Sequence, residues 1–354
     1  MGRVRSIVLT LAAGAALLGA VPGADAQSGA NPLAGLRFYV DHESPSWQQW
    51  QAYRRAGKTG KADLISKIAR EPKALWLGRF TRPNFRVKVR RLIDPARAEG
   101  SVPIFTVLRA QATGCSPGYT GGGQAEDGRT RAWYDDLAAA IGNDRVVIAF
   151  EPDSLGTIDC LTPSRRDDRL RLLRYGVEAL AKLPNAIVYL EAGASDWEPA
   201  KRTAKQLRAI GIAKAQGFML NATHYDWTRS NIRYGLKLSR LVGGKHFIVN
   251  TAENGRGPIH YGLPNGRRIN VWCNPGLRGL GIPPTTNTSN PMADAYLWIN
   301  RPGFAQSCQH RPIAWYPARA LTYARWATDW ERPPAGTKYG HFKRHSLREL
   351  GVRR

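Results

Sequence analysis

The sequence alternates between short apolar segments and stretches with helical spacing, and this alternation limits the possible folds more than any other feature. The apolar segments are rich in β-branched and aromatic residues, as strands are. They are residues 36–40, 74–77, 102–108, 145–150, 186–193, 217–222, 245–251 and 295–299. The clearest helical stretch is 168–183, whose apolar positions lie three and four apart. This alternation predicts an α/β fold in which crossover helices join parallel strands.

The predicted strands are almost continuously apolar, which is typical of a sheet covered on both faces. A chain of 354 residues with 43% hydrophobic content suits one large α/β barrel as well as two small domains. We find no linker-like segment and no internal repeat. We therefore expect a single domain at residues 27–340, preceded by an export signal at 1–26 and followed by a basic tail at 341–354.

Residues 1–26 have the pattern of a secretory signal peptide. Arg3 and Arg5 precede an apolar run at 7–21, and the small-residue sequence Ala-Asp-Ala follows at 24–26. The run is too short and too rich in Ala and Gly for a membrane span. We expect a secreted, extracellular protein without a membrane segment. An uncleaved or lipid-anchored form is the alternative, although no lipidation motif is present.

Polar residues follow the ends of four successive predicted strands. These residues are Glu151 and Asp153, Glu191, Asn221 and His224, and Thr251, Glu253 and Asn254. In a barrel of parallel strands the carboxyl ends share one face, and that face carries the active site. Alternation along an extended chain would point the side chains of Glu151 and Asp153, which follow the predicted strand 145–150, to the same side. Any one of these residues would also suit a turn or a helix cap.

The formal net charge is +25, and +24 remains once the two Arg and one Asp of residues 1–26 are removed. Such a charge attracts polyanions. No zinc-finger, helix-turn-helix or RNP-type signature accompanies it, so we do not expect nucleic acid as a partner. A solvated basic surface, or nonspecific contact with an anionic cell wall, is the interpretation we prefer.

Four cysteines in an exported chain suggest two disulfides, for which three pairings exist. The cysteines are Cys115, Cys160, Cys273 and Cys308, and pairing in sequence order is the simplest. Metal binding is the alternative, but no two of them have the close spacing of zinc ligands, and we expect no metal.

Several blocks of the sequence together resemble glycoside hydrolase family 6, the cellobiohydrolase and endoglucanase family. The blocks are "EPDSLG" (151–156), "YLEAG" (189–193), "NATHY" (221–225), "WCNPGLRGLGIPPT" (272–285) and "LWINRPG" (297–303). They occur in the order that the family has, over most of the chain after residue 26. The resemblance implies a distorted parallel (β/α) barrel of about seven strands whose active face lies at their carboxyl ends. It also places the cysteines where the two disulfides of the family lie.

The resemblance implies that Asp153 is the general acid. Cleavage of a glycosidic bond needs a carboxyl group that is still protonated when it meets the leaving oxygen, so its pKa must be raised. Glu191 stands where the family's "YLDAG" has Asp. We interpret it as electrostatic support for the reaction or as a ligand of a sugar hydroxyl.

The resemblance also implies a set of substrate-binding residues. Trp197 and Trp272 match aromatic residues that stack on sugar rings, although Trp is also a common core residue. Asn221 and His224 match a block that lines the same site, and Asn254 remains from the family's "SRNG" block. No cofactor is implied, since protonation and attack by water are sufficient for the reaction.

Besides Glu191, the chain departs from the family at four further positions. Gly114 replaces an acidic residue that supports the general acid, and Leu108 replaces a Tyr. Glu253 replaces the Arg of "SRNG", and Gln306 replaces the Asp of "KPPGESDG", which carries the candidate base. Gln cannot accept the proton of an attacking water. The base has moved to Glu191, to Glu253 or to a chain of waters, or the substrate is not cellulose, or turnover has been lost.

The sequence thus predicts a secreted, monomeric hydrolase of β-1,4-glucan that inverts the anomeric centre. The polysaccharide substrate is its expected partner. The alternative is a catalytically impaired member of the family that binds a glycan or the cell wall without cutting it.

Overall fold

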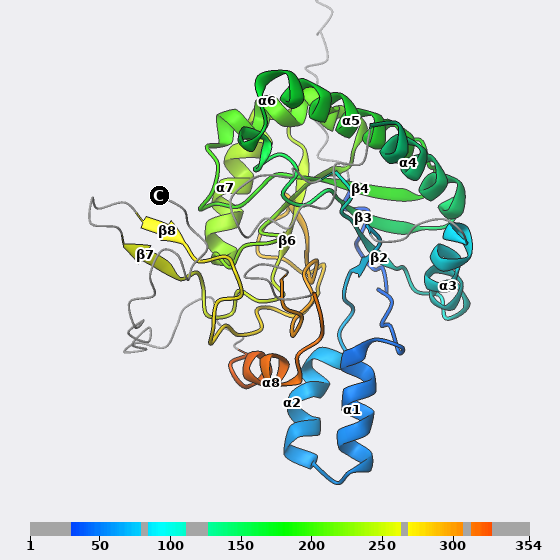
Figure 1. The fold of residues 1–354 in the computed structure, drawn as a ribbon, viewed down its shortest axis with the longest axis vertical. Helices are drawn as coiled ribbons and strands as arrows, with labels where there is room; N and C mark the ends of the chain where they lie inside the picture. Colours follow the sequence, from blue (N-terminus) through cyan, green and yellow to red (C-terminus); the bar gives the residue numbers. More distant parts are fainter. Residues whose placement is uncertain (1–29, 79–83, 111–126, 263–267, 307–312, 328–354) are drawn as a thin grey trace, which may run out of the picture.

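The computed structural model describes residues 30–78, 84–110, 127–262, 268–306 and 313–327. Its main feature is one curled sheet of seven strands (Figure 1). In spatial order the strands are β1 (Leu75–Trp76), β2 (Ile104–Val107), β3 (Val146–Phe150), β4 (Ala186–Glu191), β5 (Gly217–Leu220), β6 (His246–Asn250) and β9 (Ala293–Leu297). Every neighbouring pair is parallel. The predicted α/β fold with a parallel sheet that curls toward a barrel is confirmed.

Five helices form an arc around the outside of the sheet (Figure 1). They are α3 (Phe85–Ala98), α4 (Asp127–Ile141), α5 (Pro163–Ala181), α6 (Ala200–Ile210) and α7 (Thr228–Leu241). Each lies between two consecutive strands of the sheet, as a crossover helix does. The predicted helix 168–183 lies within α5 except for its last two residues.

Three helices form a separate group below the sheet in Figure 1. They are α1 (Pro45–Arg55), α2 (Thr59–Ala69) and α8 (Pro317–Arg325), and α2 packs against both of the others. A small antiparallel pair, β7 (His260–Gly262) and β8 (Arg268–Asn270), projects from the side. Two short 3-10 helices, Ile158–Cys160 and Ile212–Lys214, complete the described elements. No described helix is long and apolar enough to cross a membrane.

One predicted strand is wrong. Residues 36–40 form a single isolated bridge, from Phe38 to Val102, and no strand. The chain pairs there with Val102, which lies just before β2, at one residue only, whereas a strand requires consecutive paired residues.

Strand β3 shows why the strands are apolar on both faces. Val146, Ile148 and Phe150 pack into the core between the sheet and the outer helices. Val147 and Ala149 point the other way, into a second core inside the curl of the sheet. All five residues are buried, as expected for a strand between two apolar layers.

Close packing of the outer helices on the sheet depends on glycine at two positions. A Cβ at Gly235 of α7 would lie 2.6 Å from the ring of Phe247 on β6. A Cβ at Gly176 of α5 would lie 2.7 Å from the rings of Phe150 and Tyr134. Because ring atoms in a packed core cannot retreat without displacing their neighbours, both helices lie closer to the sheet than any larger residue would allow.

We predict that Gly235→Ala lowers the free energy of unfolding by about 1–3 kcal/mol, since the added methyl overlaps Phe247. Urea denaturation followed by circular dichroism measures this change. The matched control is Gly60→Ala in α2, where an added Cβ meets no atom within 4 Å. The control variant keeps or gains stability because Ala favours helix. Equal stability of the two variants would contradict the packing described here.

Candidate active site

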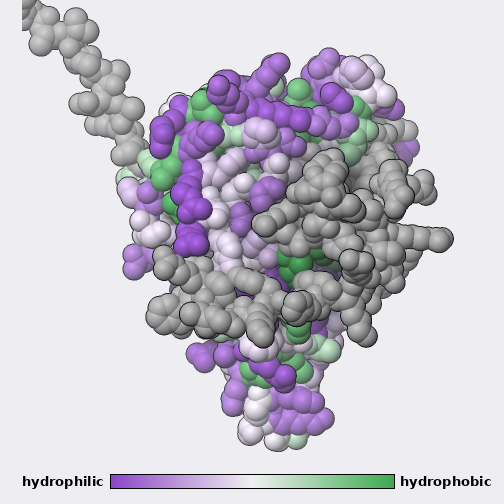
Figure 2. All heavy atoms as spheres, turned by 90° about the vertical axis from the view of Figure 1, so that its left-hand side faces the viewer, coloured by the Kyte–Doolittle hydropathy of each residue, from purple (hydrophilic) through white to green (hydrophobic). Residues whose placement is uncertain are grey.

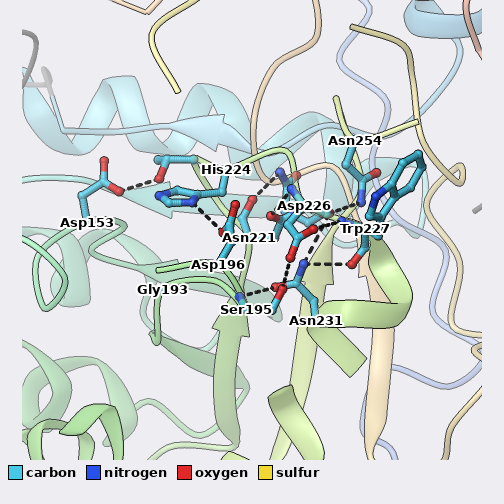
Figure 3. A network of polar contacts seen from close by, with 12 residues as sticks. Asp153, Gly193, Ser195, Asp196, Asn221, His224, Asp226, Trp227, Asn231 and Asn254 are labelled. Atoms are coloured by element: carbon cyan, nitrogen blue, oxygen red, sulfur yellow. Dashed lines mark hydrogen bonds and ion pairs between the residues drawn. The ribbon is translucent and has the colours of Figure 1, made fainter. Parts of the chain in front are cut away.

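The residues that the sequence singled out after four strands do meet at one rim of the sheet. Asp153 follows β3, Glu191 ends β4, His224 follows β5, and Glu253 follows β6. Because these strands are parallel neighbours, their carboxyl ends lie side by side. Figure 3 shows a polar network of residues that follow these strands, among them Asp153 after β3, Asp196 after β4, His224 after β5 and Asn254 after β6.

Glu151 is fully buried, and its carboxylate binds neighbouring backbone rather than facing the rim. Its oxygens accept hydrogen bonds from the backbone N–H groups of Arg109 and Ala110 at 2.8–2.9 Å and from the Tyr134 hydroxyl at 2.7 Å. Burial raises the pKa of Glu151, and these donors oppose the rise. Glu151 therefore fixes the start of the segment after β2.

The expectation that Glu151 and Asp153 point the same way is wrong. It assumed an extended chain, but both residues have left-handed backbone, with φ of 56° and 68°. The chain turns sharply after β3, so Glu151 points toward the end of β2 while Asp153 points toward the segment after β5. Left-handed backbone is uncommon and strained for residues other than Gly, and such strain is concentrated at functional sites.

Asp153 is half-buried and binds one neighbouring side chain. Its Oδ1 accepts a hydrogen bond of 2.5 Å from the Thr223 hydroxyl (Figure 3). Burial raises the pKa of Asp153, whereas the Thr223 hydrogen bond and the nearby His224 lower it. Burial prevails, so this carboxyl keeps its proton to a higher pH than an exposed Asp. No arginine forms an ion pair with it among the described residues.

Glu191 is 2% exposed and supports the turn that carries Asp153. Its Oε2 accepts a hydrogen bond of 3.2 Å from the N–H of Leu155, and its Oε1 accepts one of 2.9 Å from the N–H of Gly193. Burial, followed by repulsion from Asp153, raises the pKa of Glu191 to about 8. Because the charge of Asp153 repels a charge on the buried Glu191, the two groups cannot both be charged at low cost, and near neutral pH Glu191 is protonated.

His224 forms a pair with Asp196 and stacks on Trp197. The Nδ1 atom of His224 lies 2.9 Å from Oδ1 of Asp196, and the imidazole and indole rings are 4.7 Å apart and nearly parallel (Figure 3). Burial lowers the pKa of His224, but Asp196, followed by Asp153 and Asp226, raises it by more. The pair therefore places an imidazole with a raised pKa, that of His224, near Asp153, the predicted general acid.

Trp197 is held on two sides. One face stacks on His224, and its six-membered ring contacts Gly156, where an added Cβ would lie 2.3 Å from ring atoms. The indole is only partly buried. Trp272 is likewise partly buried, between β8 and Cys273.

The side-chain amides of Asn221 and Asn254 donate hydrogen bonds to the same backbone carbonyl group. The backbone oxygen of Asp226 accepts hydrogen bonds from the side-chain amides of Asn221, Asn231 and Asn254, at 3.1, 3.3 and 3.0 Å. The Asp226 carboxylate in turn accepts from the hydroxyl of Ser195 and from the N–H of Trp227. These contacts join the segments after β4, β5 and β6 (Figure 3), so both amides position the rim.

Glu253 lies at the same rim in a different polar group. It is 1% exposed, and its Oε2 accepts a hydrogen bond of 2.7 Å from Asn300. Burial raises the pKa of Glu253 to about 7, although Arg319 and Arg301 oppose the rise. Asp153 is not among the groups that shift its pKa, in contrast to Glu191.

Gln306 is the residue at the position of the expected base. Its backbone exchanges two hydrogen bonds with the side chain of Asn274, at 2.8 and 2.9 Å. These bonds place position 306 beside the segment that follows β8. Gly114 lies outside the described residues, and Leu108 follows β2.

The predicted disulfides fall partly outside the described residues, which include Cys160 and Cys273 but not Cys115 or Cys308. Neither Cys160 nor Cys273 is a free thiol. Their pairing stays a prediction. Among the described residues, no group of three or more His, Cys, Asp or Glu side chains is arranged to hold a metal ion.

Sequence reasoning missed two residues that touch the site, Thr223 and Asp196. Both signals were present, because Thr223 lies within "NATHY" and Asp196 directly precedes Trp197. Their roles depend on hydrogen bonds to residues 70 and 28 positions away, which only the folded chain brings together.

Comparison with known proteins gives a consistent result. The model of the family "Glycosyl hydrolases family 6" matches residues 33–341. Endoglucanase A of Thermobispora bispora is 32% identical over 92% of this chain and 70% of its own length. Endoglucanase A of Cellulomonas fimi is 34% identical over 83% of this chain, which spans only 62% of that relative.

Comparison with solved structures finds similar folds among endoglucanases. The endoglucanase Cel6 from Mycobacterium tuberculosis, in complex with methyl-cellobiosyl-4-deoxy-4-thio-β-D-cellobioside, superposes with a TM-score of 0.76. It is 36% identical, and the match covers 84% of this chain and 99% of that one. Endoglucanase CEL6B from Humicola insolens, 20% identical with a TM-score of 0.69 over 84% and 99% of the two chains, shares the fold.

We predict that Glu191 makes the protein less stable as pH rises from about 5 to about 8. In that range the folded state holds a proton on Glu191 that the unfolded chain, with an ordinary pKa near 4.5, has lost. Glu191→Gln removes this dependence, and each unit of pKa difference corresponds to about 1.4 kcal/mol. Urea denaturation of both proteins at pH 5, 6.5 and 8 measures the difference.

The matched control is Glu178→Gln in α5, because the Glu178 side chain is 37% exposed and its pKa is lowered by Lys214. Its effect on stability is constant over the same range. If the stability of Glu191→Gln and of the unaltered protein changed in parallel with pH, Glu191 would not be protonated in the folded state.

Proposed function

Because this chain belongs to glycosyl hydrolase family 6, we propose that it hydrolyses β-1,4-linked glucan, with Asp153 as the general acid. The observation that carries the proposal is the position of Asp153. It lies in the turn after β3, at the carboxyl-end rim of a parallel sheet, with its pKa raised by burial. The endoglucanase relatives support the substrate class.

The proposed reaction is a single displacement at the anomeric carbon. The Asp153 carboxyl donates its proton to the glycosidic oxygen as the bond from that oxygen to the anomeric carbon breaks. A water molecule attacks the same carbon from the opposite face and loses a proton, so the configuration is inverted. The products are two shorter sugar chains, and Asp153 regains a proton from solvent.

Neighbouring groups keep Asp153 ready for this step. The Thr223 hydroxyl donates a hydrogen bond to Oδ1 of Asp153. The acidic proton is therefore donated from the other carboxyl oxygen, Oδ2. Glu191 holds the turn through the N–H of Leu155, which is two residues beyond the acid. Since Glu191 is itself protonated near neutral pH, it adds no full negative charge beside the reacting sugar.

A second candidate function rests on one observation, the amide at position 306. An inverting hydrolase needs an acceptor for the proton of the attacking water, and Gln306 cannot accept it. Glu191, protonated near neutral pH, is a poor acceptor, and Glu253 has Asn300 on one of its oxygens. The alternative function is therefore a glycan-binding or wall-binding protein with slow turnover.

We further propose that the protein acts outside the cell as a monomer, after removal of residues 1–26. The pattern of those residues and the two cysteines that are not free thiols support this location.

We predict that Asp153→Asn lowers kcat on soluble β-1,4-glucan about 100-fold or more, because an amide cannot donate the proton that the leaving oxygen needs. Release of reducing ends from carboxymethyl cellulose measures the rate. Asp159→Asn is the control, since this exposed residue of the next turn forms an ion pair with Arg202. Unchanged release from the Asp153 variant would refute the assignment.

We also predict that Gln306→Asp raises kcat roughly tenfold or more, since it restores a carboxylate where the family has its candidate base. Gln306→Asn has nearly the same size but no charge, and it leaves kcat low. The same reducing-end assay compares the two variants. If another group already accepts the proton of the attacking water, Gln306→Asp will not raise kcat. The second candidate function, which rests on the amide at position 306, would then lose its support.

A further inference from the structure

Helices α6 and α7 carry only positive charge. Together they contain eight Lys and Arg residues and no Asp or Glu. They are neighbours in the outer arc, joined by a hydrogen bond of 2.9 Å between the Thr203 and Tyr234 hydroxyls. Many hydrophilic side chains lie at the top of the molecule in Figure 2, the end at which Figure 1 places α6.

The positive side chains of α7 lie in one row. Arg229, Arg233, Lys237 and Arg240 are all exposed. Their spacing of four, four and three residues puts them on one side of the helix, about 6 Å apart along its axis and about 16 Å from first to last. The opposite side of α7, with Ile232 and Leu238 among its residues, is buried against the sheet.

Helix α6 carries a second row beside the first. Lys201, Lys205 and Arg208 are exposed and are spaced four and three residues apart. Arg208 reaches across and donates a hydrogen bond of 2.6 Å to the carbonyl oxygen of Leu241, at the end of α7. We call these three residues and the four of α7 the α6–α7 basic face. None of the seven forms an ion pair with an acidic side chain of the described residues.

The other outer helices differ in this respect. On α3, Arg90 and Arg97 are neutralised by Asp94 and Asp144. On α5, Arg171 pairs with Asp168 within the helix. Like charges in neighbouring rows repel one another and lower stability slightly, so an arrangement without acidic partners is not explained by folding.

We propose that the α6–α7 basic face binds an acidic polysaccharide, a sugar polymer with carboxylates at regular intervals. This function is additional to the proposed hydrolysis and does not depend on it. The seven cations lie in two rows and do not converge on a pocket, so a long polyanion fits them better than a small anion. Each carboxylate bound displaces counterions from both partners, which favours association at low salt.

The chemistry of the face favours a sugar polymer over single-stranded nucleic acid. Proteins that bind single strands stack the bases on exposed aromatic rings. Helix α6 has no aromatic residue, and the one aromatic residue of α7, Tyr234, is partly buried with its hydroxyl bonded to Thr203. A face that offers charge without stacking surfaces suits a ligand recognised through its carboxylates.

The test compares two variants that lose the same charge. The first replaces Arg229, Arg233, Lys237 and Arg240 with Gln, which keeps the helix because Gln is a good helix former. The control replaces four exposed basic residues elsewhere with Gln. They are Arg55, Lys58, Arg70 and Arg86. Both variants are first checked for an unchanged circular dichroism spectrum and melting temperature.

Affinity electrophoresis through gels that contain polygalacturonate, at 50 mM and 200 mM salt, gives the dissociation constant of each protein. We expect the α7 variant to bind on the order of tenfold more weakly than the control variant at low salt, with the difference reduced at high salt. Binding to neutral hydroxyethyl cellulose, and its hydrolysis, stay the same in all three proteins. That result separates this proposal from the proposed active site.

Two outcomes would overturn the proposal. If the α7 variant and the control lost affinity equally, the overall charge would explain binding and the face would have no special role. If single-stranded DNA of matched charge bound more tightly than polygalacturonate and the α7 variant lost that binding, the partner would be nucleic acid.

Discussion

The buried carboxylate of Glu151 is the contact on which the geometry of the site depends. Glu151 directly follows β3 and has left-handed backbone. Its carboxylate accepts hydrogen bonds from two N–H groups that follow β2 and from Tyr134 of α4. A carboxylate without these donors would be costly to bury, so the contact fixes the ends of two strands and a helix relative to one another. The turn it starts brings Asp153 to the carboxyl-end rim, next to the segment after β5.

Burial gives this rim its chemistry. Three carboxyl groups there, those of Asp153, Glu191 and Glu253, have a raised pKa, and burial is the largest cause for each. The same holds for Glu151, whose carboxylate is turned toward the segment after β2. Outside, the molecule is strongly positive, with unpaired rows on α6 and α7. The fold thus keeps protonatable acids at the rim and exposes cations on the outer helices. These two regions suit different parts of a polysaccharide matrix, one neutral and one acidic.

The sequence was sufficient for the parallel sheet and for the residues at its rim, because apolar strands followed by polar groups are local patterns. It was not sufficient for what those groups do. Alternation along an extended chain misplaced Glu151, since nothing in the sequence marks left-handed backbone at Glu and Asp. The amides of Asn221 and Asn254 donate to the carbonyl group of Asp226, a contact that no local pattern marks, and their expected contact with substrate stays a prediction. Segment 36–40 has the composition of a strand, yet it meets the sheet at one residue.

The central claim is that Asp153 stays protonated above the range of an ordinary aspartate, and NMR titration tests it most directly. Protein labelled with ¹³C at the Asp side-chain carboxyl carbon, with the signal assigned by its absence in the Asp153→Asn variant, reports the midpoint of this one group. The account predicts a midpoint above the ordinary value of about 3.9 for Asp. A midpoint at or below that value would show a carboxylate that is already ionised when a sugar arrives, and the account would be contradicted.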